Sequence, residues 1–268
     1  AGLPLEESKG LKRILLILIE KITYICATRI YPNSNGLKEF ILKFIYSNEK
    51  KIKVIGYGSS NGIDTNYFHT NKNIIEESKK LHKKYMLDKK FVFSFIGRIV
   101  KDKGINELLL AFEELNSQYP NTRLLVIGWQ EPELNPISDQ SLHILNNNKN
   151  VIVEGYADDI RPFLACTDCF VLPSYREGFP NTVLQACSMN IPSIVSNING
   201  CNEIIKNNKN GILVPPKDYQ KLLIAMKKIR DDKLFLEAPP AEIRKEIIKK
   251  YDRKLFHKKV LSEYMSIF

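Results

Sequence analysis

The feature that most constrains the fold is a regular alternation, over residues 91–230, of short apolar runs with longer segments of helical periodicity. The apolar runs are continuous, which is typical of strands in a parallel sheet that helices cover on both faces. The pattern predicts an α/β fold with a doubly wound, Rossmann-like parallel sheet. Strands are expected at Phe91–Ile96, Arg123–Ile127, Val151–Val153, Cys169–Leu172, Ser193–Val195 and Gly211–Val214, with helices between them at 105–118, 138–147, 159–166, 181–189, 201–206 and 217–230.

The segments on either side of this domain follow a less regular pattern. A glycine- and serine-rich stretch at 56–62 predicts a flexible linker. No apolar run approaches the ~20 residues that span a bilayer, and no signal peptide is evident. Apolar spacing predicts helices at 11–27, 37–46, 73–88, 241–251 and 253–267, and short strands at Thr28–Pro32 and Lys51–Ile55.

The composition is that of a globular protein with an excess of positive charge. Of the 268 residues, 44% are hydrophobic and 26% are charged, and 40 Lys and Arg against 30 Asp and Glu give a net charge of +10. This charge suits an anionic partner, but it does not choose among nucleic acid, a membrane surface and a phosphorylated small molecule. The chain lacks a nucleic-acid-binding motif and an aromatic platform among its basic residues, so nucleic acid is not expected.

The cysteines and histidines do not form a pattern that indicates a metal or a catalytic nucleophile. Five cysteines are too few and too irregular for a disulfide framework, and the single C-x-x-C of Cys166 and Cys169 has no second pair to complete a zinc site. We expect buried thiols in a reducing cytoplasm, and no metal. The four histidines lie apart, in polar or lysine-rich contexts.

Residues that follow the first predicted strand are candidates for ligand binding. In a doubly wound sheet, ligands bind at the carboxyl ends of the strands, near the point where the strand order reverses. Gly97, Arg98 and Lys103 follow Phe91–Ile96. The guanidinium fork of an arginine fits phosphate oxygens, and a lysine adds a point charge. From position alone, solvated loop cations remain an open alternative.

A second group follows the strand Cys169–Leu172. Gly178 permits close backbone approach, and Pro180 favours the first turn of a helix that begins at Asn181 or Thr182. The free N–H groups of such a helix form an anion site. Glu177, just before it, suits sugar hydroxyls, although a capped surface helix with Glu177 in solvent also fits. Ser174 precedes this group, Phe179 lies within it, and Gln185 lies about two helical turns further on.

Weaker candidates follow the second and third strands. Gly128 could allow a ligand to approach the backbone, and Tyr156, Ala157 and Asp158 could touch a base. Trp129, the single tryptophan, is equally well explained as a packing residue.

Four motifs in this order resemble the nucleotide-sugar-binding domain of family 4 glycosyltransferases, retaining enzymes with the two-domain GT-B fold. They are F-I-G-R-I-V-K-D-K-G, S-Y-R-E-G-F-P-N-T-V-L-Q-A, I-P-S-I-V-S-N-I-N-G-C-N-E-I-I and N-G-I-L-V-P-P, and the resemblance is greatest to bacterial capsule, exopolysaccharide and O-antigen enzymes. It implies a partial N-terminal, acceptor-side α/β domain and linker at 1–60, a complete donor-binding domain at 61–240, and C-terminal helices at 241–268. The last helix is expected to pack back toward the N-terminal domain, most of which is expected to lie before residue 1.

The resemblance also implies roles for individual residues. Arg98 and Lys103 match the cationic pair that holds the donor diphosphate and stabilises the leaving group. Glu177 matches the first acid of the family's Glu–seven residues–Glu signature, which binds the donor sugar, whereas the second acid, which binds the ribose, falls on Gln185. The backbone of the loop between them meets sugar and phosphate through Gly178, Phe179, Pro180, Asn181 and Thr182.

The implied activity is transfer of a hexose-type sugar, with retention and without a metal or other cofactor. The donor is a nucleotide diphosphate sugar, with UDP favoured, and the acceptor is a glycan or a polyprenyl-linked glycan. A truncated donor-binding module without turnover and a sugar-nucleotide epimerase of the same fold remain alternatives. We expect a cytoplasmic protein, and a peripheral contact with the inner face of the membrane is as compatible with the lysine-rich helices as a soluble surface is.

Overall fold

The computed structural model describes residues 5, 8–131, 133, 135–231 and 242–267. Its main body is a six-stranded sheet in the order β3-β2-β1-β4-β5-β6, in which every neighbouring pair is parallel. The chain runs outward from β1 to β3, then returns to β4 beside β1 and runs outward to β6, so the order reverses between β1 and β4. The strands are β1 Phe91–Ile96, β2 Thr122–Ile127, β3 Val151–Glu154, β4 Cys169–Leu172, β5 Ser193–Ser196 and β6 Gly211–Val214.

The prediction of a doubly wound α/β fold is therefore confirmed, and each of the six strands predicted for the sheet is present to within one residue at either end. The strands carry apolar side chains on both faces because helices cover both. Phe93, Phe95 and Phe170 are fully buried, together with Phe112 from a covering helix.

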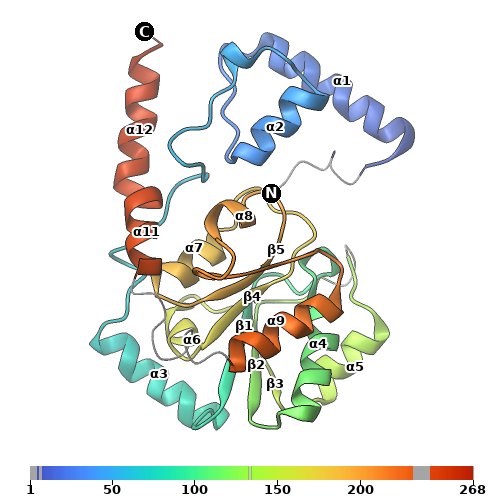
Figure 1. Ribbon diagram of the computed structural model, residues 1–268, viewed down its shortest axis with the longest axis vertical. Helices are drawn as coiled ribbons and strands as arrows, with labels where there is room; N and C mark the ends of the chain where they lie inside the picture. Colours follow the sequence, from blue (N-terminus) through green and yellow to red (C-terminus); the bar gives the residue numbers. More distant parts are fainter. Residues whose placement is uncertain (1–4, 6–7, 132, 134, 232–241, 268) are drawn as a thin grey trace.

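Helices of this body pack in two groups (Figure 1). Helix α4 packs against α5 and α9, whereas α3 packs against α6 and α7 packs against α11. Each helix lies within a few residues of its predicted range. The bounds are α3 Lys72–Tyr85, α4 Ile105–Gln118, α5 Asp139–Asn147, α6 Arg161–Ala165, α7 Asn181–Ser188, α8 Cys201–Ile204, α9 Tyr219–Asp231 and α11 Glu242–Tyr251, with a short 3-10 turn, η3, at Lys101–Lys103.

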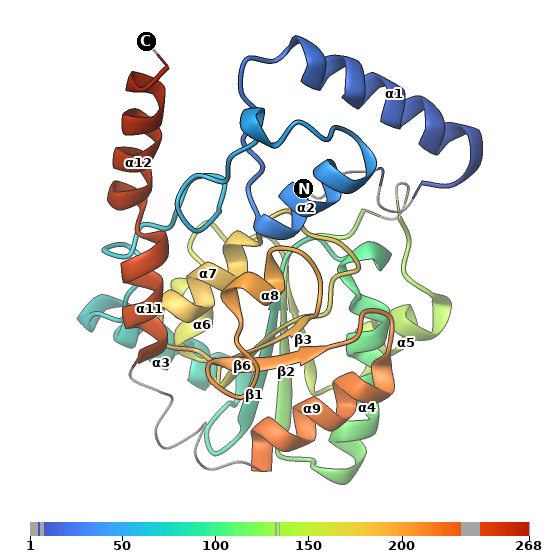
Figure 2. The same ribbon diagram turned by 45° about the horizontal axis from the view of Figure 1, so that its top comes forward.

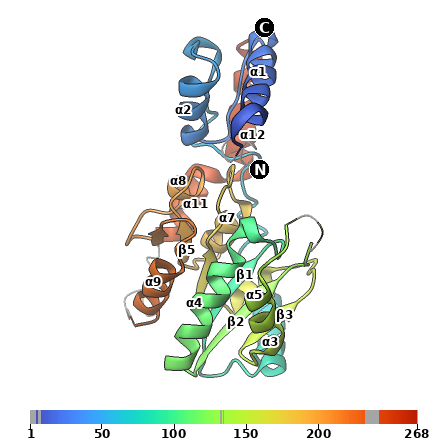
Figure 3. The ribbon, with the colours of Figure 1, turned by 90° about the vertical axis from the view of Figure 1, so that its right-hand side faces the viewer.

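The N-terminal segment lies above the sheet body and has its own small apolar cluster (Figure 3). It contains α1 Gly10–Cys26, α2 Asn35–Phe44 and the 3-10 turn η2 Glu49–Lys51. The two strands predicted here are wrong, because within the described residues a single isolated parallel bridge, Ile30 to Ile52, is all that joins the two predicted ranges. Two short paired segments without a third strand are only marginally stable, and η2 occupies the start of the second. The cluster consists of Leu5, Ile30, Ile41, Ile45 and Ile52.

Helix α12, Arg253–Met265, continues from α11 and rises beside the N-terminal segment (Figures 1 and 2). The Glu263 carboxylate accepts hydrogen bonds from Tyr31 Oη at 3.3 Å and from the ammonium of Lys53, and the rings of Tyr31 and Tyr264 lie 6.3 Å apart. Directly after the predicted linker, an isolated parallel bridge joins Ile63 to Asp252. The predicted domain boundaries, 1–60, 61–240 and 241–268, stay predictions.

Two further sequence expectations are decided by burial and helix length. Four of the five cysteines are buried and free, as predicted, but Cys26 is exposed at the end of α1. Within the described ranges, no helix is long and apolar enough to cross a membrane.

Candidate functional site

The loops that follow β1 and β4 meet where the strand order reverses. The backbone N–H of Tyr175 donates to the carbonyl of Asp102 at 2.9 Å. Gly104 has a φ of +70°, and a Cβ there would lie 2.0 Å from the carbonyl oxygen of Pro173. Only glycine tolerates this approach, which holds the η3 turn against the end of β4. The crevice expected at a topological switch point is thus built from these two loops.

The contact between the loops brings three predicted site residues together. The Lys103 ammonium lies 2.6 Å from Oε1 of Glu177, and the Ser174 hydroxyl donates to the same oxygen at 2.8 Å. The Lys103 and Glu177 side chains are 21% and 10% exposed. The alternative that Glu177 lies in solvent is therefore wrong for this structure. We call Lys103, Ser174 and Glu177 the Lys–Glu cluster.

Beside the Lys–Glu cluster lies a buried thiol, that of Cys201. Burial raises the pKa of Cys201 well above that of a free thiol, and the nearby Glu177 carboxylate raises it further. This cysteine is therefore held in its neutral form and is unsuited to act as a nucleophile. In the part of the chain that the structure describes, no group of three or more His, Cys, Asp and Glu residues could hold a metal ion.

Arg98 does not join the Lys–Glu cluster. Its Nη1 lies 2.7 Å from Oε2 of Glu131, and its side chain is 48% exposed. Arg98 and Lys103 therefore face different carboxylates, although both follow β1. Sequence reasoning missed Glu131, and the available signal was its position four residues after the end of β2.

Gly128 has a structural role that sequence reasoning did not anticipate. Its φ is +142°, and a Cβ there would lie 1.9 Å from the carbonyl oxygen of Gly97. The close approach that this glycine permits is thus to the loop after β1. The predicted approach of a ligand to Gly128 is not needed to explain the residue.

Arg98 and several weaker candidates line one small pocket at the ends of β1, β2 and β3. The pocket has a volume of about 220 Å³ and is mostly apolar. The rings of Trp129 and Tyr156 stack with centroids 5.0 Å apart and stay 55% and 64% exposed. An exposed aromatic pair above an apolar floor suits a planar ring. We call this the aromatic pocket; its lining is Ile96, Gly97, Arg98, Ile127, Gly128, Trp129, Tyr156, Ala157 and Ile160.

Helix α7 begins at Asn181, as predicted, four residues after Glu177 of the Lys–Glu cluster. Pro180 is its N-cap residue and no side chain caps it, so the first-turn N–H groups of Asn181 and Thr182 are available to an anion. A Cβ on Gly200 would lie 2.3 Å from the carbonyl oxygen of Gly178, which fixes the loop against the start of α8.

The side chains of Phe179 and Gln185, beside the backbone at the start of α7, both have buried atoms. The Phe179 ring is buried, 5.4 Å from the ring of Tyr251, and a Cβ on Gly58 would lie 2.9 Å from it. Phe179 thus offers a ligand only its backbone. Oε1 of Gln185 is buried and has no hydrogen-bond partner among the described residues.

A link between the sheet body and the N-terminal segment lies close to these residues. The Glu203 carboxylate on α8 accepts hydrogen bonds from the backbone N–H groups of Asn35 at 2.9 Å and Gly36 at 3.2 Å. Sequence reasoning placed Glu203 inside a motif but gave it no role, since its partners are more than 160 residues away.

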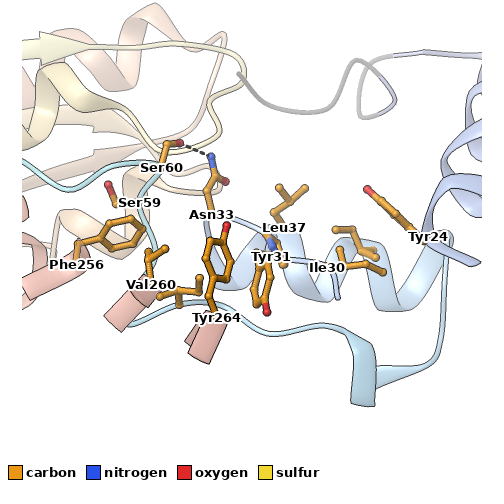
Figure 4. A pocket seen from close by; sticks show the side chains of 13 residues that line it. Tyr24, Ile30, Tyr31, Asn33, Leu37, Ser59, Ser60, Phe256, Val260 and Tyr264 are labelled. Atoms are coloured by element: carbon orange, nitrogen blue, oxygen red, sulfur yellow. Dashed lines mark hydrogen bonds between the residues drawn. The ribbon is translucent and has the colours of Figure 1, made fainter. Parts of the chain in front are cut away.

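A separate, more open pocket lies between the N-terminal segment, the linker and α12 (Figure 4). Its volume is about 540 Å³, and its walls are mostly apolar and aromatic. Asn33 Nδ2 donates to Ser60 Oγ at 3.1 Å at this pocket, and the side chains of Tyr31 and Tyr264 lie next to each other in its lining (Figure 4). None of the predicted site residues lines this pocket.

Known proteins that resemble this chain are enzymes of sugar transfer. Over 263 residues the chain is 36% identical to the capsular polysaccharide biosynthesis glycosyltransferase CapM of Staphylococcus aureus, covering 98% of this chain and 68% of that protein. It is 32% identical over 214 residues to the UDP-Gal:alpha-D-GlcNAc-diphosphoundecaprenol alpha-1,3-galactosyltransferase of Escherichia coli, covering 78% of this chain and 53% of that protein. The chain thus spans between about half and two thirds of these relatives.

Solved structures show the same fold. Anabaena Alr3699/HepE in complex with UDP and glucose superposes with a TM-score of 0.79 at 18% identity, covering 94% of this chain and 67% of that one. This likeness shows the GT-B fold alone. Residues 77–253, which include the Lys–Glu cluster and the aromatic pocket, match the family model for glycosyl transferases group 1. With this match over most of its length, the chain belongs to the glycosyl transferases group 1 family.

Proposed function

We propose that this protein transfers a hexose-type sugar from a UDP-sugar to a glycan or lipid-linked acceptor, with retention, in cell-surface polysaccharide biosynthesis. The observation that carries this proposal is the Lys–Glu cluster, held at the switch point of the sheet beside the uncapped start of α7. It offers a cation, a carboxylate and free backbone N–H groups side by side. A sugar diphosphate needs this combination, because its diphosphate is anionic and its sugar carries hydroxyl donors.

The donor would lie across the carboxyl ends of the strands. Its base would stack in the aromatic pocket, and its diphosphate would meet Arg98, Lys103 and the first turn of α7. Glu177 would accept hydrogen bonds from sugar hydroxyls, and the buried amide of Gln185 would reach the ribose. The unpartnered Oε1 of Gln185 supports the last assignment, because a buried acceptor without a donor is costly unless a ligand completes it.

Transfer in this arrangement breaks the bond between the anomeric carbon and the diphosphate oxygen, and the electron pair leaves with the diphosphate. Lys103, Arg98 and the start of α7 stabilise the charge that develops there, without a metal. The acceptor hydroxyl attacks from the face that the diphosphate leaves, and a diphosphate oxygen takes its proton. This course accounts for retention without a protein nucleophile, and the high pKa of Cys201 supports it.

The relatives support the choice of donor and acceptor. The name of the Escherichia coli relative gives UDP-Gal as its donor and a diphosphoundecaprenol-linked sugar as its acceptor. Alr3699/HepE was crystallised with UDP and glucose. We therefore favour UDP as the nucleotide and a lipid-linked glycan as the acceptor.

The position of the single tryptophan supplies a direct test. Because Trp129 stacks on Tyr156 in the aromatic pocket, a base that enters should quench its fluorescence. We expect UDP to bind without added metal, and Arg98→Ala to weaken binding by about 1.5–3 kcal/mol, the value of a charged hydrogen bond. Lys221→Ala, on the exposed face of α9, is the matched control. A folded protein that binds neither UDP nor GDP would contradict the donor site. Binding without sugar transfer would instead favour a donor-binding module without turnover.

We also propose a cytoplasmic location with a peripheral contact at the inner membrane face. This is supported by the net charge of +10 and by α1, whose exposed apolar side chains lie among Lys12, Arg13 and Lys21. The chain should sediment with vesicles that contain anionic lipid and not with zwitterionic vesicles, and binding should fall as salt is raised. Equal binding to both vesicle types would argue against a charge-driven contact.

A further inference from the structure

A polar pocket lies beside the Lys–Glu cluster, and the proposed donor roles do not use it. Its volume is about 470 Å³, within the range of small-molecule sites. It is formed where the start of the N-terminal segment meets the loops after β1, β2, β4 and β6. We call it the cationic pocket; its lining is Ser8, Lys9, Arg13, Lys101, Asp102, Asn135, Tyr175 and Lys217.

The cationic pocket holds more positive charge than its own residues balance. Four cations line it against one carboxylate, that of Asp102. Oδ2 of Asp102 already faces Arg176, at 3.5 Å. Among the residues that the structure describes, Lys9, Arg13, Lys101 and Lys217 form no ion pair with a carboxylate. Like charges gathered in a concave site repel one another, so a bound anion of two or more charges would stabilise them.

The fold positions several of these cations. Lys217 has a left-handed backbone conformation, with φ of +63°, and its ammonium lies 4.6 Å from the centre of the Tyr175 ring. The backbone N–H of Lys101 donates to the carbonyl of Asn135 at 3.1 Å. The Arg13 guanidinium lies 5.8 Å from the centre of the Phe44 ring. Aromatic rings thus hold the side chains of Arg13 and Lys217 at the pocket, and the backbone of Lys101 is fixed beside Asn135.

The location of the cationic pocket separates it from the proposed site of the nucleotide. It shares no lining residue with the aromatic pocket. It is instead adjacent in the chain to the Lys–Glu cluster, since Asp102 precedes Lys103 and Tyr175 follows Ser174. A group bound here would lie next to the donor sugar and on the side of the N-terminal segment, which α1 and α2 form above the sheet body (Figure 3).

We infer that the cationic pocket binds the diphosphate of a diphosphate-linked acceptor. The inference rests on the proposed function and narrows its acceptor to one that carries its glycan on a diphosphate. Two anionic phosphates match the excess of cations. Because the pocket lies near Glu177, an acceptor bound through its diphosphate would place a sugar hydroxyl near the donor sugar. The donor's own diphosphate is the competing occupant, so the test must separate the two.

The test is calorimetric titration of the full chain with inorganic diphosphate, first alone and then with UDP at saturation. We expect diphosphate to bind in both titrations. Arg13→Gln and Lys217→Gln should each weaken it by about tenfold, the loss of one charged hydrogen bond, while UDP affinity stays unchanged. Lys12→Gln, an exposed neighbour of Arg13 outside the pocket, is the control and should bind diphosphate like the unmodified chain.

Three outcomes are informative. Loss of diphosphate binding at saturating UDP would show that the donor site is the only diphosphate site, and would overturn the inference. Equal effects of Arg13→Gln and Lys12→Gln in folded variants, checked by circular dichroism, would overturn it too. If UDP does not bind at all but diphosphate binding still depends on Arg13 and Lys217, the donor assignment fails while the cationic pocket stands.

Discussion

The ammonium of Lys103 and the carboxylate of Glu177 are 2.6 Å apart and joined across two loops that follow different strands. In the proposed donor complex the two groups bind different parts of the donor: Lys103 would contact the diphosphate and Glu177 the sugar hydroxyls. Glu177→Ala should therefore spare UDP and weaken a UDP-sugar by about 1–3 kcal/mol, the cost of losing hydrogen bonds to a charged group. Calorimetry with UDP and UDP-glucose measures the difference. A parallel loss for both ligands would instead mean that Glu177 only positions Lys103.

The ion pair of Arg98 with Glu131 leads to a second prediction, opposite in direction. Glu131 would compete with the donor diphosphate for the guanidinium, so Glu131→Gln should tighten UDP binding. Because the Arg98 side chain is 48% exposed, the pair stabilises by at most about 1 kcal/mol, and the gain should not exceed roughly fivefold. Glu114→Gln, on the exposed face of α4, is the control. Weaker UDP binding in Glu131→Gln would mean that the ion pair orients Arg98 and does not compete with the diphosphate.

Gly128, which follows β2, and Gly155, which follows β3, form a matched pair for testing whether the close approach of Gly128 to Gly97 requires glycine. Gly128→Ala adds a Cβ 1.9 Å from the Gly97 carbonyl oxygen at a φ of +142°, and should destabilise the fold by at least about 2 kcal/mol. A Cβ on Gly155 meets nothing within 4 Å, and Gly155→Ala should change stability by no more than about 0.5 kcal/mol. Urea denaturation measures both. Equal midpoints would show that the loop relaxes without cost.

The sheet could be predicted because each of its strands is a short, mainly apolar run. A strand that helices cover on both faces needs apolar side chains at successive positions, and this pattern is visible in the sequence alone. The predictions of strands at Thr28–Pro32 and Lys51–Ile55 failed, because a short extended segment becomes a strand only when neighbouring strands complete its hydrogen bonds. It located Lys103, Ser174 and Glu177 because loops after parallel strands gather at one edge.

Partners across the fold could not be predicted from one sequence. The pairing of Arg98 with Glu131, the burial of the Phe179 ring and the approach of Gly128 to Gly97 depend on distances that residue spacing does not encode. The cationic pocket is the clearest case, because its cations come from positions as far apart as Lys9 and Lys217.

The contact of Glu203 with the start of α2 predicts how the N-terminal segment is held. A helix begins with N–H groups that have no partner within it, and here Glu203 accepts from Asn35 and Gly36, while the Ser34 hydroxyl accepts from Leu37 at 3.1 Å. Glu203→Ala should cost about 1–2 kcal/mol of local stability, the usual value of a helix cap, and so speed amide exchange in the first turn of α2 by roughly tenfold.

Hydrogen exchange followed by mass spectrometry measures this change, with Glu39→Ala, on the exposed face of the same helix, as the control. Exchange should stay unchanged in β1 and β4, since the sheet body has its own core. Faster exchange throughout the protein would mean that Glu203 supports the whole fold, and no change in α2 would mean that Ser34 alone suffices to cap it.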